Sequence, residues 1–242
     1  MERLFQIQIL FLLLFIPGFK SEDIAVGVNT HLYGSVTLPC TFNFVSGLED
    51  LFVSCTHSSS SNRKNDKLVH CYKNGQDNLK DQDIQFRGRT EMSPDLARGT
   101  LKLTLNDVGF ADEGFYTCAA ANKKGRGEMV FRISIDRLHA DDPLVVSRVS
   151  NGKTQLQCSS SGLFKEPRVE WQDGNGEDLT KNAKLPTVTK LSDGNLLVES
   201  VLDIDVQTNV HYFCRVMEGR LNRSTRAVLS DGKETVKITD DL

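Results

Sequence analysis

Six cysteines are the residues of this 242-residue chain whose spacing most sharply limits their chemistry. No Cys-x-x-Cys occurs, and no histidine stands at the distance typical of a zinc finger, which argues against a metal site. Their even number in a chain of this size favours disulfide bonds formed in an oxidising compartment. By position they fall into three pairs: Cys40 with Cys118, Cys158 with Cys214, and Cys55 with Cys71.

No arrangement typical of an enzyme accompanies the cysteines. The chain has no Gly-x-Ser-x-Gly turn and no His-Glu-x-x-His pair, and its five histidines are scattered. Gly174-Asn175-Gly176 lacks the third glycine and the following helix of a dinucleotide site. A net charge of −3 and a pI near 6.0 give no electrostatic footprint for nucleic acid. We therefore expect no catalytic residue, no metal, no cofactor and no small-molecule substrate.

Residues 1–21 have the layout of a secretory signal peptide. Arg3 supplies a positive charge, residues 9–16 (ILFLLLFI) are unbroken and apolar, and Pro17-Gly18 then ends any helix. The apolar run is too short to span a bilayer, and no second run of about twenty apolar residues follows it. We expect entry into the secretory pathway. The protein is then secreted, unless a longer form carries a membrane segment that holds it on the external face of the plasma membrane.

Short stretches with an apolar residue at every second position fill the rest of the chain. Examples are GSVTLPCTF, GTLKLTLNDV and MVFRISI in the first half, and KTQLQCS, RVEW and VHYFCRV in the second. This period, broken by turn residues, predicts an all-β fold of antiparallel sandwiches. The length after the signal peptide suits two domains of about 110 residues each. We expect a first domain at 22–137, a second at 138–238 and a polar tail at 239–242.

Cysteine and tryptophan spacing places both sandwiches in the immunoglobulin class. Trp171 stands between Cys158 and Cys214, and Cys, Trp, Cys on successive strands is the immunoglobulin pattern, in which the indole packs against an inter-sheet disulfide. The segment between Cys71 and Cys118 is long enough for strands C″, D, E and F. The expected fold is therefore two tandem immunoglobulin-like β-sandwiches, variable-type and then constant-type.

Two tyrosines support the same assignment. Tyr116 and Tyr212 each stand two positions before the second cysteine of a pair, which is the tyrosine-corner position. In the first domain, Asp112 stands at the turn before Tyr116, and we expect its carboxylate to pair with Arg89 from the stretch QFRGRT.

The first domain departs from the pattern at Cys55, which stands where a tryptophan is expected. Cys71 falls where the next strand, C′, should run. We predict a third disulfide between the two, which would join neighbouring strands and partly replace the packing of the missing indole. The alternative is a buried thiol at 55 and a reactive thiol at 71, because a disulfide needs close Cβ atoms that the sequence does not reveal.

Two segments resemble a known family. GLFKEPRVEWQDGNGEDL is similar to the constant-type domain of the butyrophilin and B-seven ligands, with the aromatic residue displaced by one position. LVHCYKNGQDNLKDQDIQFRGRTEM resembles the C′–D region of the same ligands. The resemblance spans nearly all of residues 30–230 and implies membership of the B-seven/butyrophilin family of immunoglobulin-superfamily T-cell co-signalling ligands. The matching positions of the second segment include Tyr72, Gln82, Asp83, Arg89 and Thr90.

The resemblance implies a glycoprotein whose variable-type domain binds a receptor on T or natural killer cells and modulates activation and cytokine production. It implies a contact face on strands G, F, C and C′ and on the F–G loop, expected at 119–127. We assign receptor contacts to Tyr72, Lys123, Lys124 and Arg126. The alternatives are half-buried packing for Tyr72 and a solvated hairpin tip for the cations. A soluble decoy, a homophilic adhesion molecule and a homodimer also stay open.

One sequon for N-glycosylation is present, Asn222-Arg223-Ser224, near the expected F–G turn or G strand of the second domain. An exposed sequon in a secreted chain is usually modified. We predict a glycan on Asn222 that supports solubility and folding.

Overall fold

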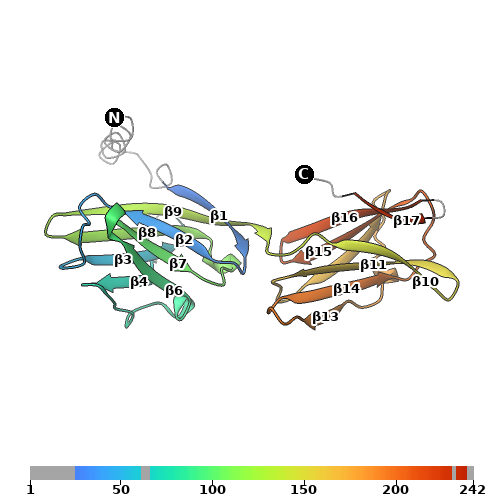
Figure 1. The fold of residues 1–242 in the computed structure, drawn as a ribbon, viewed down its shortest axis with the longest axis horizontal. Helices are drawn as coiled ribbons and strands as arrows, with labels where there is room; N and C mark the ends of the chain where they lie inside the picture. Colours follow the sequence, from blue (N-terminus) through green and yellow to red (C-terminus); the bar gives the residue numbers. More distant parts are fainter. Residues whose placement is uncertain (1–24, 61–65, 231–232, 239–242) are drawn as a thin grey trace, which may run out of the picture. The chain divides into compact units, whose positions relative to one another are not determined.

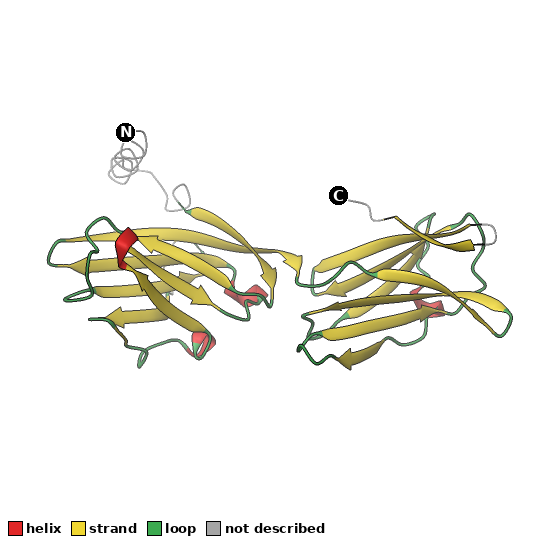
Figure 2. Cartoon of the chain, in the orientation of Figure 1, coloured by secondary structure: helices red, strands yellow, loops and turns green. Residues whose placement is uncertain are grey.

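The computed structural model of the chain describes residues 25–60, 66–230 and 233–238. Most of these residues lie in short strands, joined by turns and a few 3₁₀ turns (Figure 2). The chain divides between Ile135 and Asp136 into two compact units. No helix in the described part of the chain is long and apolar enough to cross a membrane. The expected signal peptide at 1–21 and the tail at 239–242 lie outside the described residues.

The first domain is a sandwich of two sheets (Figure 1). The larger sheet has the strand order β1-β9-β8-β3-β4-β5, and the smaller has the order β2-β7-β6. Buried and exposed residues alternate strictly along β2, as the period of two predicts. The elements are β1 (Val26–Leu32), β2 (Val36–Thr41), β3 (Phe52–Ser58), β4 (Lys67–Lys73), β5 (Gln76–Asp77), η2 (Ile84–Phe86), β6 (Thr90–Asp95), η3 (Leu96–Arg98), β7 (Thr100–Leu105), η4 (Phe110–Asp112), β8 (Gly114–Asn122) and β9 (Gly125–Leu138).

The second domain is also a two-sheet sandwich, so the predicted all-β architecture is confirmed (Figure 1). Its sheets have the orders β10-β11-β14-β13 and β12-β15-β16-β17. The elements are β10 (Leu144–Ser150), β11 (Lys153–Gly162), β12 (Arg168–Asp173), η5 (Thr180–Asn182), β13 (Thr187–Lys190), β14 (Leu196–Leu202), β15 (His211–Glu218), β16 (Leu221–Ser230) and β17 (Lys233–Ile238).

The core of the second domain holds the expected disulfide and indole. Cys158 and Cys214 are bonded across the two sheets, with Cα atoms 6.4 Å apart. Trp171 is almost fully buried and lies directly opposite Cys214 on the neighbouring strand. Its indole Nε1–H donates to the hydroxyl of Ser200 at 3.0 Å, and Ser200 is the cross-strand partner of Cys158. The four residues form one layer, in which a hydrogen bond satisfies the buried indole N–H.

The tyrosine corner of the second domain is confirmed. The Tyr212 hydroxyl accepts a hydrogen bond from the backbone N–H of Gln207 at 3.1 Å, five residues upstream. Tyr212 itself is buried. This bond ties the segment that precedes β15 to the strand that carries Cys214.

Replacing both Cys158 and Cys214 by alanine should lower the free energy of unfolding of the second domain. The bridge spans 56 residues, and on the chain-entropy model a loop of this size is worth about 4 kcal/mol. Trp171 is the only tryptophan of the chain, so urea unfolding followed by its fluorescence reports on this domain. A Cys71→Ala variant is the control, because its cysteine lies in the other domain. An unchanged unfolding midpoint in the double variant would contradict the prediction.

Candidate functional site

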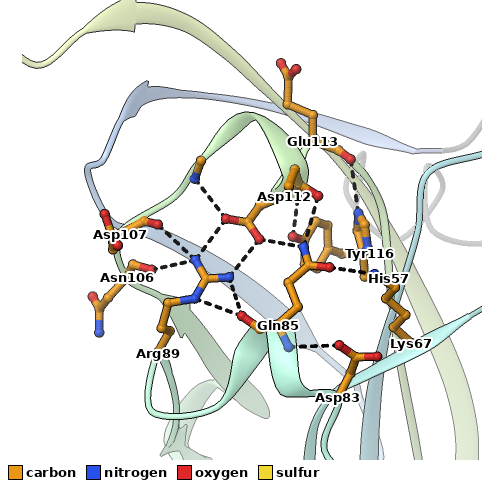
Figure 3. Close-up of polar contacts among 12 residues, drawn as sticks. His57, Lys67, Asp83, Gln85, Arg89, Asn106, Asp107, Asp112, Glu113 and Tyr116 are labelled. Carbon is orange, nitrogen blue, oxygen red and sulfur yellow. Dashed lines mark hydrogen bonds and ion pairs between the residues drawn. The ribbon is translucent and has the colours of Figure 1, made fainter. Parts of the chain in front are cut away.

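A buried ion pair fixes the end of the first domain where β8 begins (Figure 3). The Arg89 guanidinium donates two hydrogen bonds to the Asp112 carboxylate, at 2.8 and 2.9 Å. The Tyr116 hydroxyl donates to the backbone carbonyl of Asp112 at 2.8 Å. Both the predicted Arg89–Asp112 pair and the tyrosine corner are therefore confirmed.

The Asp112 carboxylate is held in its charged form by several donors. Burial alone would raise its pKa, but hydrogen bonds from Arg89, Gln85 and the Gly109 N–H outweigh burial and lower the pKa below its ordinary value. A bidentate pair with further donors is the arrangement in which a buried charge is best satisfied. The network locks the start of β8, and so the register of the strand that carries Cys118.

His57 extends this network into the core, and sequence reasoning missed it. Its Nε2 lies 3.0 Å from the carbonyl oxygen of Glu113, and its ring centroid lies 4.8 Å from that of Tyr116. Nε2–H is thus the donor, and the buried Nδ1 has no hydrogen-bond partner among the described residues. A signal existed in the sequence: His57 stands two positions after Cys55 and therefore shares its inward face.

A second polar cluster positions β4, which lies between β3 and β5 in the larger sheet. The His70 ring is fully buried, with Nδ1 at 3.0 Å from the Thr90 hydroxyl and Nε2 at 2.9 Å from an Asp77 carboxylate oxygen. Gln82 donates to the same hydroxyl and to the Val69 carbonyl, both at 2.8 Å. These bonds tie β4 to β6 of the facing sheet and explain why the C′–D segment carries these polar residues.

Three cysteine sulfurs meet in the core of the first domain. The Sγ atoms of Cys40, Cys55 and Cys118 all lie within 4.8 Å of one another, and all three residues are fully buried. Cys55 and Cys118 are direct cross-strand partners on β3 and β8, whereas Cys40 belongs to β2 of the facing sheet. The structure holds these cysteines and Cys71 as thiols. The disulfide predicted between Cys40 and Cys118 stays a prediction, and the proximity of their sulfurs is compatible with it.

The predicted disulfide between Cys55 and Cys71 is wrong. Strand pairing aligns Cys55 with His70 and aligns Cys71 with Ser54. Because successive side chains on a strand point to opposite faces, Cys55 points into the core and Cys71 points away from it. The alternative of a buried thiol at 55 agrees with the structure. Burial raises the pKa of Cys71, which lowers its reactivity at neutral pH.

The three clustered thiols are also the one set with metal-ligand spacing among the described residues. Structural zinc in proteins is almost always bound by four ligands, and the described part of the chain offers no fourth ligand to this cluster. We therefore assign the cluster to sulfur–sulfur chemistry rather than to a metal.

Cys55 occupies the position that Trp171 holds in the second domain. Trp171 pairs directly with Cys214, and Cys55 pairs directly with Cys118 in the same way. The residue opposite the inter-sheet cysteine on the neighbouring strand also differs between the domains. Ser200 lies opposite Cys158, whereas Leu101 lies opposite Cys40. Leu101 is fully buried and apolar, which fits a core without an indole N–H to satisfy.

Three cross-strand rows of residues form the outward side of β9, β8, β3 and β4, here called the outer face. The strand pairings align Lys73, Phe52, Ala121 and Arg126 in the first row, Cys71, Ser54, Ala119 and Glu128 in the second, and Leu68, Thr56, Thr117 and Val130 in the third. All four residues of the first row are exposed. Phe52 is 43% exposed, which is unusual for a large aromatic side chain.

The assignment of Tyr72 to receptor contact is wrong. Tyr72 pairs with the inward residue Val53 and is only 6% exposed, so it faces the core. The aromatic residue on the outer face is Phe52, which the sequence reasoning missed. The position could have been found, because Phe52 stands three residues before Cys55 and therefore points to the opposite side of β3.

The F–G connection is much shorter than the loop expected at 119–127. β8 continues to Asn122 and β9 begins at Gly125, which leaves a two-residue tip. The Asn122 side-chain oxygen accepts the backbone N–H of Lys124 at 2.8 Å and of Gly125 at 3.0 Å, and this closes the turn. A Cβ on Gly125 would lie 2.9 Å from the Phe44 ring. The glycine therefore provides packing space rather than loop flexibility.

The three predicted basic residues lie in different surroundings. The Lys123 ammonium lies 2.6 Å from the Asp50 carboxylate, and that of Lys124 donates to the Ser46 hydroxyl at 2.7 Å. Both contacts join the tip to the segment between β2 and β3. Arg126 is exposed in the first row of the outer face. Of the three, Arg126 therefore has the clearest position for contact with a partner.

Asn222 lies at the start of β16, and its side chain is exposed. The predicted sequon is thus accessible on the strand that follows the β15–β16 turn. The glycan itself stays a prediction.

Sequence comparisons match each half of the chain to a domain family. Residues 25–135 match the immunoglobulin V-set domain. Residues 138–226 match a family described as "Butyrophilin subfamily 3 member A2-like, Ig-C domain". The matched regions are a V-set immunoglobulin domain and, after it, a butyrophilin-like Ig-C domain, in agreement with the two sandwiches of the structure. These matches support the expectation that the protein is a recognition molecule and not an enzyme.

Individual relatives point the same way. Butyrophilin subfamily 2 member A2 of Homo sapiens is 29% identical over 153 residues, which are 63% of this chain and 27% of that protein. Selection and upkeep of intraepithelial T-cells protein 5 of Mus musculus is 25% identical over 145 residues, 60% of this chain and 10% of that protein. The chain thus spans about a quarter or less of these relatives. A solved structure, the crystal structure of bovine butyrophilin, is 18% identical with a TM-score of 0.43 over 85% of this chain and 94% of that chain.

The unpartnered ring nitrogen of His57 predicts a pH-dependent first domain. Burial lowers the pKa of His57, although the hydrogen bond to Glu113 and the charges of Asp112 and Asp66 oppose the shift and Lys67 adds to it. Below the ordinary histidine pKa of about 6.5, the unfolded chain therefore takes up a proton more readily than the folded one. We expect stability to fall as the pH drops from 7 to 5, and a His57→Gln variant to show a weaker dependence.

Calorimetry of the full chain at several pH values measures this effect, with Trp171 fluorescence identifying the transition of the second domain. Glutamine keeps an N–H for the Glu113 carbonyl but does not titrate. The matched control is His211→Gln, because His211 is exposed on β15. Equal pH dependence of wild type and His57→Gln would overturn the prediction.

Proposed function

We propose that the protein is an immune co-signalling ligand. It binds a receptor on T cells or natural killer cells through the outer face of its first domain, and so modulates lymphocyte activation and cytokine production. The observation that carries this proposal is the exposed row of Lys73, Phe52, Ala121 and Arg126 across four neighbouring strands.

The composition of this row suits a protein partner. Phe52, the first residue of β3, provides exposed apolar surface in the interior of the row, and aromatic residues are enriched among those that contribute most to binding. Its neighbours on β8, Ala119 and Ala121, are exposed and small. A partner can therefore approach the β8 backbone closely and contact the ring from the side.

Charge at the ends of the row indicates the chemistry of the partner. Lys73 and Arg126 flank the apolar centre, and the cations of the hairpin tip lie at the end of β8 and β9. Positive groups around an apolar contact favour a receptor surface with an acidic rim, and they speed association more than they add affinity. We propose that Arg126 makes a direct contact, and that Lys123 and Lys124 steer the encounter.

Relatives support a role that involves lymphocytes. One is named for the selection and upkeep of intraepithelial T cells, and others are butyrophilins. Taking both resembling segments together over residues 30–230, we propose that the chain is most like the ligand called HERV-H LTR-associating protein two. We propose that the chain passes through the secretory pathway and acts at the external face of the plasma membrane or as a secreted form.

A Phe52→Ser variant tests the proposed face. We expect wild-type protein to stain activated T or natural killer cells, and the variant to bind at least about tenfold more weakly, since truncation of a central aromatic anchor costs about 2 kcal/mol or more. Flow cytometry with a dilution series of fluorescent full-length protein measures the difference. Circular dichroism of the same samples checks that both proteins are folded.

The matched control is Ile84→Ser, which also removes a large exposed apolar side chain from the first domain. Ile84 is 80% exposed and lies in η2, which is not one of the strands that form the outer face. Equal loss in both variants would contradict the assignment of the face. If wild-type protein stains no lymphocyte but self-associates in ultracentrifugation, a homophilic adhesion molecule replaces the proposed ligand.

The proposed glycan has a separate test. Protein expressed in the secretory pathway should lose apparent mass on treatment with an N-glycan-cleaving amidase, and an Asn222→Gln variant should not. Electrophoretic mobility measures the shift. Unchanged mobility of the wild type after treatment would show that Asn222 is not modified.

A further inference from the structure

Three cysteine sulfurs cluster in the core of the first domain, where one inter-sheet bridge needs two. We propose that Cys55 is a third disulfide-forming position, so that the domain closes its core in two alternative ways, Cys40–Cys118 and Cys40–Cys55. The basis is the cluster geometry, in which all three Sγ atoms lie within 4.8 Å of one another. The proposal does not depend on the identity or existence of a receptor.

Cys40 is common to both bridges because of its place in the fold. It is the one member of the cluster on the smaller sheet, whereas Cys55 and Cys118 lie side by side on the larger sheet. Any bond that joins the two sheets must therefore use Cys40. Hydrogen bonds from the Cys118 and Cys55 thiols lower the pKa of Cys40 to about 5. The hydrogen bond with Cys40, together with burial, raises the pKa of Cys118, and burial raises that of Cys55.

The chemistry balances without a metal or cofactor. To form either bridge, two thiols give up two protons and two electrons to a disulfide oxidant of the glutathione class. Exchange between the bridges then needs no further oxidant. Cys55, which rests as a thiol, gives up its proton as its sulfur attacks Cys40 Sγ. The Cys40–Cys55 bond forms, the Cys40–Cys118 bond breaks, and the Cys118 sulfur leaves and takes up the proton lost by Cys55.

Burial keeps this exchange within the cluster. Because Cys40, Cys55 and Cys118 are fully buried, external thiols do not reach them in the folded domain. The nearest sulfur for any bridge is therefore always the third member of the cluster. Cys71 takes no part, because it lies on the other side of the sheet.

Each bridge ties a different strand of the outer face to the smaller sheet. The Cys40–Cys118 bridge anchors β8, whose outward residues Thr117 and Ala119 flank Cys118. The Cys40–Cys55 bridge instead anchors β3, on which Ser54 and Thr56 flank Cys55. The two isomers therefore differ in which strand of this surface is covalently held.

Disulfide mapping of the secreted full chain tests the proposal. Free thiols are blocked with N-ethylmaleimide in acid under unfolding conditions, and the protein is cleaved without reduction after Glu49, which separates Cys40 from Cys55. We expect the wild type to give both the Cys40–Cys118 and the Cys40–Cys55 linked peptides. A Cys118→Ser variant should place nearly all of its Cys40 in the Cys40–Cys55 peptide.

Two controls keep the result decisive. A Cys71→Ser variant should leave the ratio of the two linked peptides unchanged, and a Cys55→Ser variant should give only the Cys40–Cys118 peptide. If Cys118→Ser protein is not secreted, the wild type is instead reduced, unfolded and refolded in a glutathione buffer before blocking, and both peptides are again expected. The proposal is overturned if Cys55 is recovered only as a blocked thiol in two samples. The first is the secreted wild type. The second is the Cys118→Ser protein or, if that is not secreted, the wild type refolded in the glutathione buffer.

Discussion

The space between the two sheets, at the layer of the inter-sheet cysteines, is the constraint on which both domains depend. In the second domain, Trp171 fills this layer against the Cys158–Cys214 bond and gives its N–H to Ser200. In the first domain, Cys55 takes the place of the indole, and Leu101 takes the place of the serine. The two changes are consistent, because without an indole N–H a buried hydroxyl would lose its donor. Because a cysteine stands where the second domain has its indole, the sulfurs of Cys40, Cys55 and Cys118 lie together in the core of the first domain.

The outer face follows from that core through the alternation of side chains. With Cys55 and Val53 inward, Phe52 and Ser54 must point out, and the pairing with β8 places the alanines beside them. The Arg89–Asp112 pair and the Tyr116 hydroxyl hold the start of β8, so this register is fixed from one end. The outer face and the core are thus two sides of the same strands.

Local patterns made much of this predictable from the sequence. Alternation along β2, the tyrosine corners and the Arg89–Asp112 pair depend on residues with known spacing, so the sequence alone sufficed. The side to which Cys71 and Tyr72 point depends on the register of β4, which contains an irregularity opposite Cys55. A slip of one residue exchanges the two faces, and no spacing in the sequence specifies it. Gly125 and Gly127 pack against phenylalanines about eighty positions earlier in the chain, and no local pattern in the sequence shows this.

The position of Cys55 is the central claim, since it determines both the sulfur cluster and the exposure of Phe52. Anomalous scattering from sulfur in a crystal of the secreted protein locates every cysteine directly. The account predicts the sulfurs of Cys40, Cys55 and Cys118 within 4.8 Å of one another, whichever pair is bonded, and the sulfur of Cys71 apart from them. A bond of about 2 Å between the sulfurs of Cys55 and Cys71 would contradict it.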